Sequence, residues 1–182
     1  MKVGVLAVQG AFAEMEAYWR AKGADVFEIR QRSDLESAMD TLALPGGEST
    51  VQGKLLKDLG MFEPLKERIV AGLPVFATCA GLILLAERVE DPGSCDGTRP
   101  EKWFGTLPVA VRRNAYGRQL GSFSAVGTFD GRPGVTMTFI RAPAIVEVLS
   151  PEVETLSVFD DRPTSVRYRG MTAFAWHPEL GT

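Results

Sequence analysis

Residues 76–86, FATCAGLILLA, place Cys79 between two apolar runs. The run before the cysteine is typical of a buried strand, and the run after it is typical of a helix. A strand that passes directly into a helix leaves a tight turn at the carboxyl end of the sheet, where open α/β folds bind their ligands. This stretch therefore predicts an α/β fold with Cys79 at its functional edge.

The rest of the first half repeats this alternation. Apolar runs that predict strands occupy residues 3–8, 26–29, 41–44 and 74–78. Helical patterns occupy residues 11–22, 34–39 and 80–89, with one further helix capped by Ser49 or Thr50 and another that carries Pro64 in its first turn. Strands that alternate with helices indicate a mostly parallel sheet flanked by helices.

The pattern changes after Glu90, where helical signals become rare. Short strand-like runs, separated by Gly, Pro and Asp, cover residues 109–112, 123–129, 135–140, 146–149, 155–159, 165–168 and 172–176. We expect the first six of these runs to be antiparallel additions to the sheet, and residues 172–176 to be a last strand. With no repeat or linker that divides the sequence, residues 1–182 are expected to form a single domain.

Composition narrows the function to small-molecule chemistry. The 182 residues carry a net charge of −3 with acidic and basic residues interleaved, which disfavours nucleic acid or an anionic membrane as a partner. The sequence shows no signal peptide and no apolar segment long enough to cross a bilayer. A cytoplasmic location is expected, with Cys79 and Cys95 as free thiols.

Cys79 has two interpretations. As a nucleophile it would stand at a helix N-terminus, whose positive dipole end favours a thiolate, among small neighbours that leave room for a substrate carbonyl. As a structural residue it would simply pack, since cysteine is among the most buried residue types. The segment alone favours the nucleophile without excluding the packing role.

His177 is the only histidine in the sequence and follows the strand-like residues 172–176. In an extended segment residues two apart project to the same side, so Glu179 could orient the imidazole. The alternative is a terminal histidine beside a solvated glutamate. Because both Cys79 and His177 end a strand, the paired interpretation is favoured, whereas Cys95 lies in a polar loop and is expected to be a bystander.

The loop LPGGEST at residues 44–50 ends another parallel strand, so it should lie on the same edge of the sheet. Two glycines allow backbone N–H groups to turn toward an oxyanion or a carboxylate, and Ser49 offers a hydroxyl. A plain turn followed by a helix cap would also explain this composition.

Six segments together resemble the class I glutamine amidotransferases, and more narrowly the glutaminase subunits of pyridoxal 5′-phosphate synthase. They are VLAVQGAFAEM at 5–15, LPGGEST at 44–50, FATCAGL at 76–82, RNAYGRQ at 113–119, FIRAP at 139–143 and HPEL at 177–180. A Cys with a His-x-Glu indicates only the superfamily. PGGEST combined with RNxxGRQ and IRAP is specific to the subunit.

The resemblance implies a glutaminase that needs neither a metal nor a cofactor. Cys79 would attack the side-chain amide of glutamine to give a thioester and ammonia, with His177 as acid and base and Glu179 orienting it. Backbone N–H groups of Gly47 and Ala80 would form the oxyanion hole. The implied glutamine-binding residues are Gly47, Glu48, Ser49, Arg113, Ile140 and Arg141. Pattern alone does not separate Arg113 from Arg112.

The resemblance also implies a partner, a TIM-barrel synthase subunit that receives the ammonia within a hetero-oligomeric complex. Gln9 and Gly10 match the segment that meets this partner, although a strand-to-helix turn would account for Gly10 as well. Weak turnover is expected without the partner.

Departures from the family pattern are Met15 in place of a histidine, Ala77 in place of a glycine, an insertion near residues 93–102, and an end at Thr182 where the family continues into a closing helix. The last is expected to affect stability or docking. A glutaminase of purine or histidine synthesis and a silent glutamine-binding scaffold are the alternatives.

Overall fold

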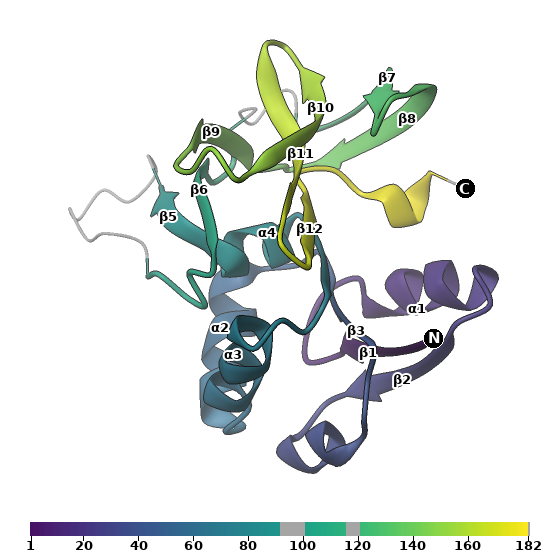
Figure 1. The fold of residues 1–182 in the computed structure, drawn as a ribbon, viewed down its shortest axis with the longest axis vertical. Helices are drawn as coiled ribbons and strands as arrows, with labels where there is room; N and C mark the ends of the chain where they lie inside the picture. The colour runs from purple at the N-terminus through teal and green to yellow at the C-terminus, as the bar shows by residue number, and fades with distance from the viewer. Residues whose placement is uncertain (92–100, 116–120, 182) are drawn as a thin grey trace.

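A seven-stranded β-sheet forms the centre of this computed structural model, which describes residues 1–91, 101–115 and 121–181 (Figure 1). The strand order is β10-β11-β12-β4-β3-β1-β2. The strands are β1 (Lys2–Leu6), β2 (Asp25–Ile29), β3 (Thr41–Leu44), β4 (Val75–Thr78), β10 (Glu154–Phe159), β11 (Arg162–Tyr168) and β12 (Met171–Phe174). Strands β12, β4, β3, β1 and β2 pair in parallel, whereas β10 and β11 are antiparallel additions.

Helices cover both faces of this sheet (Figure 1). Val3 and Val5 of β1 face α1 (Phe12–Ala21), because side chains two apart on a strand point to the same side. Leu6 belongs to the larger core on the other face, beneath α2 (Ser49–Asp58), α3 (Phe62–Val70) and α4 (Ala80–Leu85). Two 3₁₀ helices complete the described set, η1 (Arg32–Glu36) and η2 (Pro178–Leu180).

Two smaller sheets extend the second half. Strands β5 (Ala86–Glu90), β6 (Leu107–Arg112) and β9 (Ala144–Val148) form one, which contributes Val109 and Ile145 to the larger core. Strands β7 (Ser122–Phe129) and β8 (Arg132–Ile140) form a hairpin. Its Met137 and Phe139 pack against Phe174 and Trp176, so the hairpin covers the same sheet face as α1.

The structure confirms the α/β class and finds each predicted strand within three residues of its expected bounds. Three local predictions were wrong. The helix expected over residues 80–89 ends at Leu85, because Ala86–Glu90 pairs with β6 instead. The helix expected over residues 34–39 is the 3₁₀ helix η1. The cap of α2 is Glu48, and neither Ser49 nor Thr50 has this role.

The pairing of β12 with β4 joins the two halves of the chain. Phe174 lies opposite Thr78 in this parallel register, and the Cys79 N–H donates to the Phe174 carbonyl at 2.8 Å. The last strand of the second half is thus inserted beside the last strand of the first half. We propose on this basis that residues 1–182 form one domain.

Within the described part of the chain, no helix is both long and apolar enough to cross a membrane.

Replacing Leu42 with Ala should lower the free energy of unfolding by about 2–5 kcal/mol, because this side chain is fully buried on an interior strand of the sheet. Val70→Ala is the control, since Val70 is 68% exposed and its truncation should change stability by no more than about 0.5 kcal/mol. Urea unfolding of both variants measures the difference. Equal effects would contradict the assigned core.

Candidate active site

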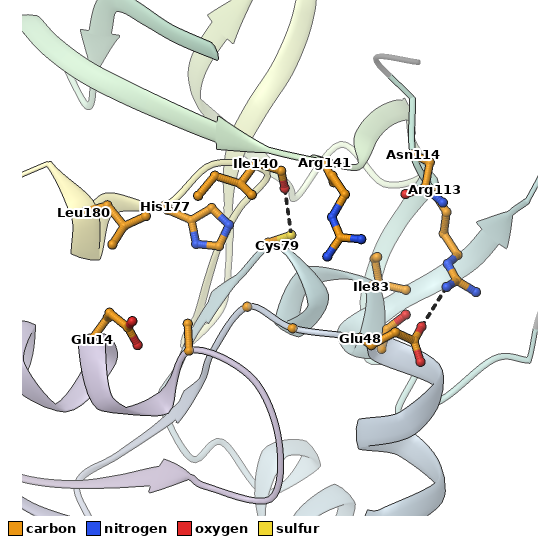
Figure 2. A pocket seen from close by; sticks show the side chains of 14 residues that line it. Glu14, Glu48, Cys79, Ile83, Arg113, Asn114, Ile140, Arg141, His177 and Leu180 are labelled. Atoms are coloured by element: carbon orange, nitrogen blue, oxygen red, sulfur yellow. Dashed lines mark hydrogen bonds and ion pairs between the residues drawn. The ribbon is translucent and has the colours of Figure 1, made fainter. Parts of the chain in front are cut away.

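A cavity of about 370 Å³ opens at the carboxyl ends of β3, β4 and β12 (Figure 2). Its lining combines a thiol, an imidazole and two arginines with backbone of the β3–α2 loop. The residues that line it are Ala11, Glu14, Gly46, Gly47, Glu48, Ser49, Cys79, Ile83, Arg113, Asn114, Ile140, Arg141, His177 and Leu180. In Figure 2, Arg113 and Arg141 lie on one side of Cys79, and His177 and Leu180 lie on the other.

Cys79 sits on the predicted turn, in a strained conformation with φ 50° and ψ −101°. A non-glycine residue with positive φ is uncommon, and such strain gathers at functional sites. The turn is tight because α4 begins at the next residue and packs closely on β3. A Cβ added to Gly81 would lie 2.3 Å from the Leu44 carbonyl oxygen, so only glycine allows this approach. Cys79 Sγ lies 3.9 Å from the Ile140 carbonyl oxygen.

His177 and Glu179 form the expected pair. Nδ1 of His177 lies 2.8 Å from Oε1 of Glu179, and both side chains are buried. The His177 backbone is fixed as well, since its N–H donates to the Thr138 carbonyl at 2.8 Å. The ring is thereby held from two sides next to the turn that carries Cys79.

The imidazole of His177 is held in its charged form. Burial by itself would lower its pKa, but hydrogen bonds and electrostatic interactions with Cys79 and Glu179 outweigh burial and raise the pKa to about 10. His177 therefore carries a proton at neutral pH and can give it to a leaving group beside Cys79. This arrangement favours the nucleophile over the packing role of Cys79.

The glycine loop between β3 and α2 lies directly against the histidine. A Cβ on Gly46 would come within 2.4 Å of Cε1 of His177, so a side chain at this position would displace the ring. Gly47 has φ 158° and lies beside the Gln9 side chain. Ala80 is the first residue of α4, so its N–H has no acceptor within the helix. The oxyanion role of Gly47 and Ala80 stays a prediction.

Gln9 and Gly10 hold this loop in place. Oε1 of Gln9 accepts a hydrogen bond from the Glu48 N–H at 2.9 Å, and Gln52 donates to the Gln9 carbonyl at 3.0 Å. Gly10 has φ 98°, and a Cβ there would collide with the Gly46 carbonyl oxygen at 2.0 Å. Both residues contact the glycine loop, and their contact with a partner remains a prediction.

Glu48 has a structural task that the sequence did not reveal. Its carboxylate accepts from the N–H groups of Thr50 and Val51 at the start of α2, and it pairs with Arg113 at 2.8 Å. Burial acts to raise the pKa of Glu48, but these two N–H groups and the Arg113 charge lower it overall. Glu48 is thus a helix cap and an anchor for Arg113.

The structure also separates Arg113 from Arg112. Arg113 lines the cavity, where it contacts Glu48 and, at 3.3 Å, Asp91. Arg112 instead pairs with Glu90 on an exposed surface at 3.0 Å. Arg141 lines the cavity next to Ile140 with φ 41°, another strained position.

Sequence reasoning missed several residues of this site. Gly46, Glu14 and Asn114 line the cavity, Asp91 supports Arg113, and Thr78 contacts Glu179. The two adjacent glycines were the only signal for Gly46. Of the two thiols, Cys79 is free, and Cys95 lies outside the described residues.

No cluster of three or more His, Cys, Asp or Glu side chains that could bind a metal occurs in residues 1–91, 101–115 and 121–181.

The model of the SNO glutamine amidotransferase family matches residues 5–182. The chain belongs to this family. Among the relatives, the pyridoxal 5′-phosphate synthase subunit PdxT of Desulfitobacterium hafniense (strain DSM 10664 / DCB-2) is 52% identical over 180 residues, covering 99% of this chain and 86% of its own length. The subunit of the same name from Methanocorpusculum labreanum is 48% identical, covering 100% of this chain and 91% of its own length.

Solved structures agree with this membership. A crystal structure of a glutamine amidotransferase has a TM-score of 0.87 and 37% identity, over 98% of this chain and 90% of that one. The PurLQS structure from Thermotoga maritima has a TM-score of 0.65 at 12% identity, covering 98% of this chain and 87% of that one, and shows the shared fold alone. These structures therefore support the α/β fold of this chain.

The raised pKa of His177 can be tested by NMR, because a single histidine gives one imidazole signal. In the native protein the ring should stay protonated as the pH rises from 6 to 9, since its pKa is raised from 6.5 to about 10. In Cys79→Ala one of the two supporting groups is lost, so the ring should lose its proton at lower pH than in the native protein. A native titration midpoint near 6.5 would contradict the stabilisation of the charged ring by Cys79 and Glu179.

Proposed function

We propose that this protein is the glutaminase subunit of a pyridoxal 5′-phosphate synthase, which hydrolyses L-glutamine to L-glutamate and ammonia and passes the ammonia to a synthase subunit for vitamin B6 biosynthesis. The observation that carries the proposal is the strained Cys79 beside a protonated His177 that Glu179 orients, at the mouth of a cavity lined by arginines. The membership in the SNO family supports the choice of glutamine.

Glutamine would bind with its side-chain amide at Cys79 and its α-carboxylate toward the arginines. Arg113 and Arg141 supply positive charge on the side of the cavity away from His177 (Figure 2). Arginine suits a carboxylate because its planar N–H groups match the two oxygens. Glu48 and Ser49 would contact the α-amino end, with Gly47 and Ile140 contributing backbone.

The first half of the reaction would be acyl transfer to the thiolate. Cys79 Sγ attacks the amide carbon, and the oxygen that becomes negative is stabilised by the N–H groups of Gly47 and Ala80. His177 then gives its proton to the departing nitrogen, which leaves as ammonia. A glutamyl thioester remains on Cys79.

The second half would be hydrolysis. The now neutral His177 takes a proton from water, which attacks the thioester carbon, and Cys79 departs as a thiolate beside the imidazolium. Glutamate leaves, and the resting ion pair is restored. Glu179 holds the ring through Nδ1 in both halves, so the other nitrogen stays directed at the reacting atoms.

The partner would be a TIM-barrel synthase subunit in a hetero-oligomeric complex. The relatives are named as subunits of pyridoxal 5′-phosphate synthase, which supports an assembly of this kind. Gln9 and Gly10 are proposed to meet this partner. Since both also hold the glycine loop, docking there would act on the catalytic loop directly. The connected Cys79, His177 and Glu179 make a silent glutamine-binding scaffold the weaker alternative.

Ammonia release from glutamine should be slow for the isolated chain and strongly stimulated by the cognate synthase subunit. Cys79→Ala should reduce the stimulated rate by about a thousandfold or more, because no other group can form the thioester. Cys95→Ala is the matched thiol control and should keep the native rate. If the synthase subunit still stimulated ammonia release by Cys79→Ala, this would contradict the covalent route. If the native complex released no ammonia, this would contradict the proposed function.

Adjacent arginines provide a test of substrate binding. Arg113→Met should raise KM for glutamine by about 10- to 100-fold, because the carboxylate loses a charged hydrogen-bond partner. Arg112→Met, which removes only the exposed pair with Glu90, should leave KM within about twofold. Steady-state ammonia assays with the synthase subunit measure both constants. Equal KM values for the two variants would argue against Arg113 as a glutamine-binding residue.

A further inference from the structure

Thr78 is the last residue of β4 and immediately precedes the proposed nucleophile. Its side chain shares a sheet face with Phe76, which packs on Tyr18 and Trp19 of α1, because residues two apart on a strand point to the same side. Thr78 is completely buried on this face. A buried hydroxyl costs free energy unless it finds a hydrogen-bond partner.

The hydrogen-bond partner of the Thr78 hydroxyl is the carboxylate of Glu179. Oγ1 of Thr78 donates to Oε1 of Glu179 at 3.1 Å, across 101 positions of sequence. The same Oε1 lies 2.8 Å from Nδ1 of His177. One carboxylate oxygen therefore connects the end of β4 to the imidazole.

The other oxygen of Glu179 offers no alternative anchor. Oε2 is buried and has no hydrogen-bond partner among the described residues. The carboxylate also affects Tyr18, whose pKa is raised by burial and by the charge of Glu179. Within the part of the chain that the structure describes, the carboxylate of Glu179 is thus fixed by two side chains, Thr78 and His177.

We propose that Thr78 is a positioning residue for the glutaminase reaction: its hydroxyl holds Oε1 of Glu179 where it orients His177. The inference rests on the proposed function of this site. It adds a fourth side chain to Cys79, His177 and Glu179, one that touches no reacting atom and acts through the carboxylate.

The geometry explains why this position is suited to the task. Glu179 lies in η2, a helix of only three residues, so its local backbone gives the carboxylate little support. Strand β4 is held between β3 and β12 at the centre of the sheet. The Thr78 hydroxyl therefore ties the carboxylate to a rigid strand, the same strand whose end places Cys79.

Loss of the hydroxyl should affect the chemical step more than substrate binding. His177 must give a proton to the leaving nitrogen and later take one from water, and both transfers depend on the direction of its ring. The arginines proposed to bind glutamine lie on the other side of Cys79 (Figure 2). The expected result is a lower kcat with little change in KM.

The test uses the complex with the cognate synthase subunit and measures kcat and KM for glutamine. Thr78→Val removes the hydroxyl with little change of shape and should lower kcat by about 10- to 100-fold with KM within about twofold. Thr78→Ser, which keeps the hydroxyl, should recover most of the native kcat. Thr164→Val is the matched control, a buried threonine of β11 whose hydroxyl bonds to Ser157, and it should keep the native kcat.

A double-mutant cycle with Glu179→Gln distinguishes positioning from general support of the fold. If Thr78 acts through Glu179, Thr78→Val should change kcat by less than about twofold in the Glu179→Gln background. Multiplicative losses would overturn the inference. Thr78→Ala replaces the valine variant in the same cycle if Thr78→Val does not fold.

The two proposals fail in different ways. A native complex that releases ammonia, together with Thr78→Val at the native kcat, would overturn the role of Thr78 and leave the glutaminase function intact. A native complex that releases no ammonia would overturn both.

Discussion

The parallel pairing of β12 with β4 is the contact on which the rest of the site depends. It sets Phe174 opposite Thr78, so the residues that follow each strand emerge at the same edge of the sheet. Cys79 and His177, 98 positions apart, become neighbours only through this register. A shift by one residue would turn every side chain of β12 to the opposite face. The buried cores on both faces therefore fix the register, and with it the distance between Cys79 and His177.

Close approach of backbone to side chain is the second constraint. The turn at Cys79 packs on β3 only because Gly81 lacks a side chain. The imidazole of His177 fits against the loop between β3 and α2 only because Gly46 lacks a side chain. The strain of Cys79 at φ 50° is tolerated because its N–H bonds to β12 and helix α4 follows at once. Packing against a large apolar core supplies the rigidity that keeps the strained turn in place.

The sequence predicted the features that local patterns encode. Apolar alternation located the strands, and two strand ends located Cys79 and His177. Local patterns do not show which residues far apart in the sequence come into contact. The sequence did not reveal that the Glu48 carboxylate caps α2 and pairs with Arg113, 65 positions away. Helix α4 was predicted too long because Ala, Glu and Arg at residues 86–88 are good helix formers, and only pairing with β6 makes this segment a strand.

The charges of the site follow from how these constraints combine. Burial alone would lower the pKa of His177, because it disfavours the charged ring. Here the fold places a sulfur on one side of the ring and a buried carboxylate on the other, and their effect exceeds the cost of burial. The carboxylate can keep its charge in this apolar setting because Oε1 receives donors from both His177 and Thr78. His177 therefore already carries the proton that the proposed acyl transfer requires, as a consequence of where β4, β12 and η2 end.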